Sequence, residues 1–201
     1  MSNAETQNEI KMENLSSLLF STLDEKIFFG HLGQYFRDHF QVDNVKVYLI
    51  HHDQKAELVT LNGDIIEDSD LVDKGVGPVG HVVRTRKPYF SNNVERDPLF
   101  EREAKEGVKR ELCLPISHEG VVIATLHLQM MDESLDFSRE HMTEAISILN
   151  QLKKPIANMK MYLAAKFLNE ALIKQIEDKE KELEEKKGGV DFSSSYKIED
   201  K

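Results

Sequence analysis

The sequence predicts an α+β domain in which helices from both ends of the chain cover one face of an antiparallel sheet and long loops cover the other. Three observations predict this class. Apolar residues recur at helical spacing over residues 5–40 and again after residue 138, they alternate with a period of two in between, and short turns join the alternating runs as hairpins. Antiparallel neighbours with helices gathered at both ends are typical of an α+β layer.

The composition is that of a globular chain that folds without disulfides. Of the 201 residues, 40% are hydrophobic and 31% are charged, which suits a core with a strongly charged extension. The net charge of −10 disfavours diffuse binding to nucleic acid or to an anionic membrane. The single cysteine excludes an internal disulfide and a zinc site built on paired cysteines. Because the chain shows neither a long apolar run nor a secretory start, we expect a cytoplasmic protein.

The first predicted elements are two helices. Residues 2–4 resemble a cloning remnant, and apolar side chains then follow a helical spacing to about residue 20. Thr22 and Glu25 have the spacing of a capping box, so a second helix is expected over about Leu23–Phe40. Its apolar stripe is expected to pack in the core and comprises Phe28, Leu32, Phe36 and Phe40.

A hairpin is expected next. Apolar residues alternate over Val45–Ile50, and the polar residues His51–Gln54 interrupt the run. A second strand over Leu58–Leu61 ends at the turn residues Asn62-Gly63.

A glycine-rich segment and long loops follow this hairpin. Lys74–Gly80 predicts a tight turn with a short helix to about Thr85, and Pro88 suits the start of a short strand that ends at Ser91. A short charged helix is expected around Leu99–Glu106. Because the glycine pattern precedes another strand and does not open a long helix, we expect a turn and not a nucleotide-phosphate loop. Long ordered loops over a sheet usually enclose something, which makes a small-molecule pocket the first functional expectation.

The last elements are a second hairpin and a long helix. Strands over Glu111–Ser117 and Val121–Met130 are joined by a turn that Gly120 permits. The helix is expected to begin after Ser138, to bend near Pro155 and to stop at Gly188-Gly189.

These elements divide the chain into four regions. They are an N-terminal helix over 1–22, a domain over 23–162, a coiled-coil-like helical extension over 163–187 and a linker or disordered tail over 188–201. At 1.5 Å per residue the last helix would span about 75 Å, too long to pack on a domain of this size. We therefore expect it to pair with its twin in a homodimer, and a frayed, solvated helix is the alternative. The residues expected to form this dimer stem are Ile156, Met159, Leu163, Phe167, Ile176 and Leu183.

The order of the motifs resembles the GAF family of sensor domains. In that family a glycine turn leads through a short helix to a strand that begins at proline, and a D-V-x-x-D-P-x-F stretch follows. The matching stretches are Gly75–Phe90, Asn93–Phe100, Gly107–Ile116, Gly120–Leu128 and Phe137-Ser138. The resemblance covers roughly Leu23–Tyr162 and implies a GAF-like sheet with a sensory or regulatory role.

Two strands are predicted to place polar side chains on the loop-covered face. Along Val121–Met130 the even positions are uniformly apolar and should pack on the helices, whereas Thr125 and His127 should face the loops. Cys113 on the partner strand is expected on the same side. The residues predicted to line a small-molecule pocket are Phe90, Asn92, Phe100, Arg110, Cys113, Thr125 and His127.

No metal or other cofactor is predicted. Cys113 and His127 are two potential ligands without a third at a fixed spacing, and core packing is expected for the cysteine. The resemblance leaves open a haem held through His81 or His127. Nucleotide-binding members carry an N-K-F-D-E pattern that is not found here, and bilin-binding members attach the pigment to a cysteine followed by His or Tyr, whereas Leu114 follows Cys113.

Enzymatic activity is not expected. The chain contains no G-x-S-x-G elbow, no H-E-x-x-H motif and no carboxylate pair at a motif spacing. Some GAF relatives reduce methionine sulfoxide with cysteines, but one cysteine cannot form the internal disulfide that such a cycle normally needs.

The sequence therefore predicts a sensory module that binds a small effector and signals through a helical homodimer to an output domain or partner protein. The alternative is a dimerisation scaffold whose pocket is closed and empty. Large apolar side chains on the mixed face, such as Phe90 and Phe100, would favour that alternative.

Overall fold

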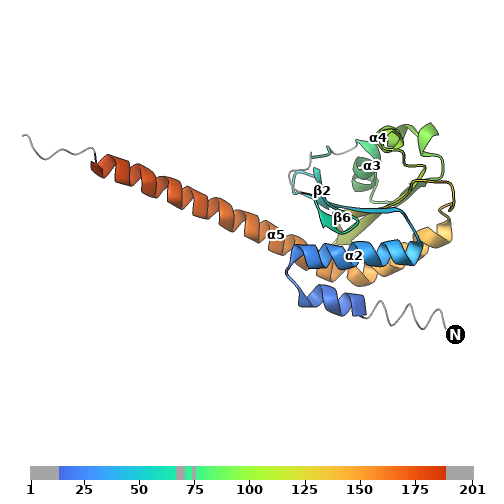
Figure 1. The fold of residues 1–201 in the computed structure, drawn as a ribbon, viewed down its shortest axis with the longest axis horizontal. Helices are drawn as coiled ribbons and strands as arrows, with labels where there is room; N and C mark the ends of the chain where they lie inside the picture. The colour runs from blue at the N-terminus through green and yellow to red at the C-terminus, as the bar shows by residue number, and fades with distance from the viewer. Residues whose placement is uncertain (1–13, 67–70, 74–75, 189–201) are drawn as a thin grey trace, which may run out of the picture. The chain divides into compact units, whose positions relative to one another are not determined.

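The computed structural model describes residues 14–66, 71–73 and 76–188, and its sheet lies between two layers of helices (Figure 1). Within these residues the sheet is antiparallel, has six strands and follows the order β3-β2-β1-β6-β5-β4. The strands are β1 (Asn44–Ile50), β2 (Ala56–Leu61), β3 (Asp64–Ile65), β4 (Tyr89–Ser91), β5 (Arg110–His118) and β6 (Val121–Met130). The predicted α+β class is confirmed.

The pairing of β1 with β6 joins the two hairpins and gives the sheet two different faces. On one face Val45 lies opposite Leu128 and Val47 lies opposite Leu126. On the other face the paired residues are polar or aromatic, namely Asn44 with Gln129, Lys46 with His127 and Tyr48 with Thr125. Since side chains alternate along a strand, the apolar residues of β6 point to the terminal helices and its polar residues point to the short elements on the other side.

The apolar face is covered by α2 (Glu25–Phe40) and by the first part of α5 (Arg139–Gly188), and a helix over residues 14–21 lies on the side of these two helices away from the sheet (Figure 1). The predicted stripe of four aromatic and aliphatic side chains on α2 is buried as expected. The predicted capping box is wrong, because the helix begins two residues later, at Glu25. Asp24 is the N-cap and accepts a hydrogen bond from the backbone N–H of Ile27, while Thr22 accepts from the backbone N–H of Asp24.

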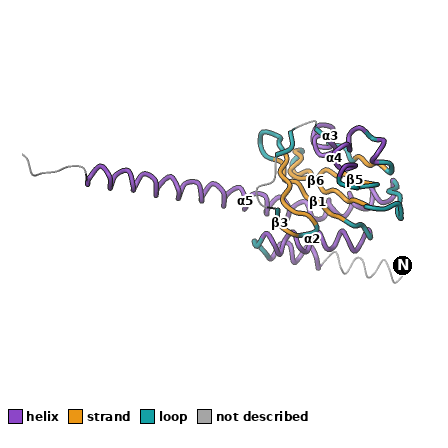
Figure 2. Tube along the Cα trace, turned by 45° about the horizontal axis from the view of Figure 1, so that its top comes forward, coloured by secondary structure: helices purple, strands orange, loops and turns teal. Residues whose placement is uncertain are grey.

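The mixed face is covered by short elements instead of long helices (Figure 2). They are α3 (Gly77–Thr85), the 3-10 turns η1 (Val94–Arg96) and η2 (Pro98–Phe100), and α4 (Glu101–Lys105). Gly77 has φ of 61° at the start of α3, a left-handed conformation that favours glycine. The predicted tight turn lies here, although Lys74 and Gly75 are outside the described residues.

Helix α5 begins as predicted, because the Ser138 hydroxyl accepts hydrogen bonds from the backbone N–H groups of Glu140 and His141. The helix has 50 residues and continues through Pro155. It passes from one compact unit, Met1–Lys160, into a second, Met161–Lys201. The predicted tail from residue 189 onward and the predicted helix before residue 14 lie outside the described residues. Among the helices that the structure describes, none has both the length and the apolar character needed to cross a bilayer.

Candidate functional site

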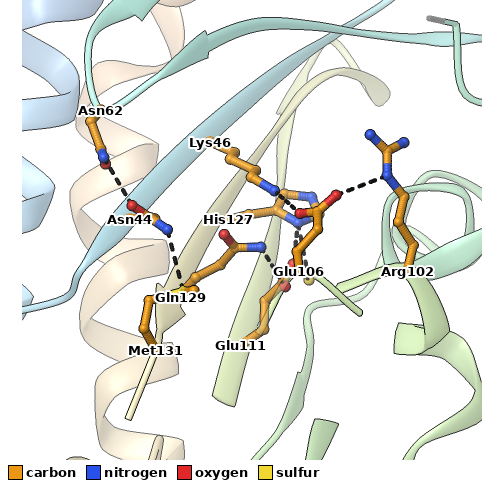
Figure 3. Close-up of polar contacts among 10 residues, drawn as sticks. Asn44, Lys46, Asn62, Arg102, Glu106, Glu111, His127, Gln129 and Met131 are labelled. Carbon is orange, nitrogen blue, oxygen red and sulfur yellow. Dashed lines mark hydrogen bonds and ion pairs between the residues drawn. The ribbon is translucent and has the colours of Figure 1, made fainter. Parts of the chain in front are cut away.

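Strands β5 and β6 bring five polar side chains together in the middle of the mixed face. We call Glu111, Cys113, Thr125, His127 and Gln129 the buried polar group, because each is at most 1% exposed. The register sets Glu111 opposite Gln129 and Cys113 opposite His127. Figure 3 shows the side chains of Glu111, His127 and Gln129 converging from the two strands.

Glu111 is the centre of the hydrogen bonds in this group. Its Oε1 accepts from His127 Nδ1 at 2.6 Å and from Cys113 Sγ at 3.2 Å, and its Oε2 accepts from Gln129 Nε2 at 2.7 Å. His127 Nε2 lies 3.1 Å from the Thr125 hydroxyl. Leaving a buried hydrogen-bonding group without its partner typically costs about 1–3 kcal/mol, so these contacts hold β5 and β6 in one register.

The thiol of Cys113 is kept protonated by its surroundings. Burial raises the pKa of Cys113 well above its usual value, and the neighbouring Glu111 carboxylate raises it further. Because the thiolate is the nucleophilic form of cysteine, the side chain is poorly suited to attack a substrate. In the absence of a metal ion, the arrangement favours hydrogen bonding over covalent chemistry.

A cleft of about 540 Å³ opens above the sheet between α3 and the η2–α4 segment. Its walls include the apolar side chains of Val79 and Leu99, and charged side chains of α4 such as Arg102 form its rim. Tyr48 also lines the cleft, and its ring centroid lies 5.0 Å from that of His127. Tyr48 therefore connects the cleft to the buried polar group.

Glu103 on α4 is an unusual carboxyl beside this cleft. It is 7% exposed, and its Oε2 has no hydrogen-bond partner among the described residues. Burial, with a smaller contribution from the Glu111 carboxylate, raises the pKa of Glu103 to about 7. Burial also raises the pKa of Tyr48. Glu103 therefore changes its charge near neutral pH at the edge of the cleft.

An ion-pair chain joins α4 to the sheet at the rim of the cleft. Glu106 accepts from Lys46 Nζ at 2.8 Å and from Arg102 Nε at 3.1 Å (Figure 3). Lys46 comes from β1, so this chain ties α4 to the sheet.

Four of the seven predicted pocket residues come together in the structure. Cys113, Thr125 and His127 belong to the buried polar group, as their shared face predicted. Phe100 is fully buried and packs in the same cluster as Cys113. The cleft walls that the structure describes nevertheless include none of the seven, so their role in ligand binding stays a prediction.

The other three predicted residues lie elsewhere. Phe90 pairs with Leu112, which puts it on the helix-covered face, so its predicted position on the mixed face is wrong. The Asn92 amide makes two 2.9 Å hydrogen bonds with the backbone of Phe137. Arg110 donates to the Asp136 carboxylate and to a backbone carbonyl in the loop before α5.

The predicted stem residues divide between the two units. Ile156 and Met159 are buried in the first unit, so they belong to the domain core and are not free to meet a partner. Leu163 is half-buried. The remaining three are exposed, with Phe167 at 75%, Ile176 at 56% and Leu183 at 57%.

Glu111, Gln129, Glu103 and Tyr48 were missed as site residues. The period of two could have found Glu111 and Gln129, since each lies two positions from a predicted residue on the same face. Tyr48 alternates in the same way on β1. Glu103 carries no such signal, because the charged run of α4 reads as a solvated helix.

A six-stranded antiparallel sheet with terminal helices on one face and a cleft under short helices on the other is the architecture of a regulatory α+β domain. The family model of the GAF domain matches residues 22–153, more than half of the chain. The chain therefore belongs to the GAF domain family, a fold used for regulation and sensing.

Solved structures agree with this family, at identities that show the fold alone. The GAF domain of a phosphoenolpyruvate-protein phosphotransferase from Acinetobacter is 19% identical with a TM-score of 0.65, and the match covers 79% of this chain and 96% of that one. The corresponding domain from Coxiella burnetii is 15% identical with a TM-score of 0.66, covering 81% and 99%. A free methionine-R-sulfoxide reductase from Neisseria meningitidis, an enzyme, is 13% identical with a TM-score of 0.64, covering 80% and 95%. No curated protein sequence matches this chain.

Proposed function

We propose that this chain is a sensory GAF module that binds a small effector in the cleft between α3 and α4. In this proposal, binding changes the pairing of two α5 helices, and an output domain or partner protein reads that change. The observation that carries the proposal is the position of Tyr48, which lines the cleft and lies on β1. The neighbouring residues of β1, Val47 and Leu49, face the helix layer, so one strand contacts both the occupant and the helices.

The cleft has the character of a small-molecule site. Ligand pockets of about 300–1,000 Å³ combine apolar walls with a few polar groups that fix orientation. Here apolar side chains from α3 and η2 face a charged rim from α4 within a volume of about 540 Å³.

The described part of the second unit supports helix pairing. Tyr162, Asn169, Ile176 and Leu183 repeat every seven residues, and Leu172 falls at the d position of that heptad. Its exposed large apolar side chains lie at a, d, e or g positions, apart from Phe167 at f. A single Asn at an a position favours a defined register in parallel two-stranded coiled coils. A parallel homodimer would cover these side chains.

The coupling needs only two packing states of the helix layer. An effector that prefers one state by about 1–3 kcal/mol changes the dimerisation constant by 5–150-fold. By reciprocity the dimer then binds the effector more tightly, or less tightly, by the same factor.

Sedimentation equilibrium of the full chain tests the pairing. Ile176→Lys puts a charge into the proposed seam and should weaken the dimer by at least about tenfold, since burying an unpaired charge is costly. Phe167→Lys is the matched control. The sequence places Phe167 among the expected stem residues, but its f position lies outside the seam proposed here, so this variant should leave the dimer intact. Equal effects of both variants, or a monomeric wild type, would refute the proposed stem.

A ligand screen by thermal shift tests effector binding. The dimerisation constant is then measured with and without each ligand that binds. A true effector should raise the Tm of the wild type, change its dimerisation constant, and lose both effects in Leu99→Trp, which fills the cleft. Native mass spectrometry and an absorption spectrum of the purified chain would reveal any carried molecule, including a haem. If cleft ligands bind without altering the dimer, the signalling step is wrong.

The second candidate is a dimerisation scaffold with a closed, empty pocket. The burial of Phe100 favours it, because this ring and Tyr89 stack at 5.8 Å and fill space beside Cys113. A dimer that forms through α5 while the screen yields no cleft ligand would support the scaffold over the sensor.

A further inference from the structure

We propose that the buried polar group binds one divalent transition-metal ion of the zinc type through Glu111, Cys113 and His127. Carboxylate oxygen, thiolate sulfur and imidazole nitrogen are the ligand types that zinc takes in proteins. In the described chain these three ligand atoms all lie within 4.8 Å of one another, and all three residues are buried. The inference does not depend on the cleft binding an effector.

The three ligand atoms are almost far enough apart to hold a metal. Glu111 Oε1, Cys113 Sγ and His127 Nδ1 form a triangle with sides of 2.6, 3.2 and 3.3 Å. Zinc bonds of about 2.0–2.3 Å at tetrahedral angles place ligand atoms roughly 3.3–3.6 Å apart. The distances from Cys113 Sγ to Glu111 Oε1 and to His127 Nδ1 need to lengthen by up to a few tenths of an ångström. The Glu111–His127 side must open by under about 1 Å as the metal replaces the proton between them.

Two further residues hold the ligands as outer partners of a metal site do. The second nitrogen of a metal-binding histidine usually bonds to an oxygen that fixes the ring, and ligating carboxylates are themselves hydrogen-bonded. Here His127 Nε2 lies 3.1 Å from the Thr125 hydroxyl, and Glu111 Oε2 accepts from Gln129 at 2.7 Å. Both ligands are therefore oriented before any metal arrives.

Metal binding would leave the site without net charge. The thiol proton of Cys113 passes to solvent. The proton on His127 Nδ1 moves to Nε2, so the neutral imidazole binds the metal through Nδ1 and donates from Nε2 to Thr125. One thiolate and one carboxylate then balance the two positive charges, which suits complete burial.

Two side-chain oxygens in the buried surroundings also lack a partner. Gln129 Oε1 and Glu103 Oε2 are buried and have no hydrogen-bond partner among the described residues. Three protein ligands leave a fourth position, which in such zinc sites is taken by water. A metal-bound water would bring O–H donors of the kind that these acceptors lack.

Elemental analysis of the full chain tests the proposal. The chain is produced in medium with added zinc, and separately with added cobalt, so that the metal is present while the protein folds. After dialysis we expect about one metal ion per chain. The cobalt form should show the near-ultraviolet charge-transfer absorption of a thiolate–cobalt bond.

Three variants test the site: one changes a ligand, one is a control, and one changes an outer partner. Cys113→Ser should lose the charge-transfer absorption, and its metal content should fall by at least about tenfold. His51→Gln is the matched control, since it alters a histidine paired with Glu57 on the surface and should change neither. Thr125→Val should keep the absorption while weakening the affinity by about 10–100-fold.

Circular dichroism shows which variants fold. Should Cys113→Ser fail to fold, the wild-type absorption and the Thr125→Val affinity decide the question. Folded wild-type chain with less than a tenth of an ion, cobalt bound without thiolate absorption, or undiminished metal in folded Cys113→Ser would each overturn the proposal.

Discussion

The carboxyl of Glu103 is predicted to make the domain less stable as the pH rises toward neutrality. Its pKa is about 7 in the folded chain, against 4.5 for the ordinary group, because burial disfavours the charged form. The folded chain therefore keeps this proton to a higher pH than the unfolded chain, and unfolding releases it between those two values. Stability from this group falls as the pH rises from 4.5 and reaches its lowest level above pH 7.

The magnitude follows from the two pKa values. A tenfold change in acid dissociation corresponds to about 1.4 kcal/mol, so charging Glu103 in the folded domain costs about 3 kcal/mol at pH 8 and under about 1 kcal/mol at pH 5. Glu103→Gln keeps the shape and removes the ionisation. We expect the variant to be more stable than the wild type at pH 8 and nearly equal to it at pH 5.

Urea unfolding followed by circular dichroism at the two pH values measures this difference. Glu101→Gln is the matched control on the same helix, because its carboxyl is exposed and pairs with Lys105, so we expect little change at either pH. A Glu103→Gln difference of the same size at pH 5 and pH 8 would show that the carboxyl is not held protonated by burial.

Two further variants test packing on the helix-covered side by urea unfolding. Gly33→Ala should cost about 1–3 kcal/mol, because its Cβ would lie 2.8 Å from the backbone of the β2–β3 turn. Gly30→Ala on the same helix meets open space among the described residues and should be neutral or gain up to about 1 kcal/mol. Asn92→Ala should cost about 1–3 kcal/mol through two lost hydrogen bonds to Phe137, whereas exposed Asn93→Ala should cost little. Equal effects within either pair would contradict these packing assignments.

Most of the fold could be predicted from sequence patterns that have a local physical cause. Alternation along β6 predicted both the strand and the shared face of Thr125 and His127, because side-chain direction is fixed within the strand. Ser138 predicted the start of α5, because a capping hydroxyl acts on the next few residues.

The structure departs from the predictions where the position of a side chain depends on residues far away in the sequence. Phe90 is expected on the mixed face, but the direction of its side chain depends on the register of β4 against β5, which no local pattern reveals. The hydrogen bonds of Arg110 and Asn92 with the loop before α5 could not be predicted either, because that loop lies far away in the sequence. Glu103 could not be recognised, because its burial results from docking α4 onto the sheet.

The borders of the sheet restrict how two copies can associate. β3 has two residues and β4 has three, so each border strand offers only a short row of free backbone groups. Addition of a strand from a neighbouring molecule needs a longer template, and short borders are one way in which natural sheets resist such growth. Short border strands therefore disfavour fibril-like stacking of these domains at both ends of the sheet, independently of any pairing through α5.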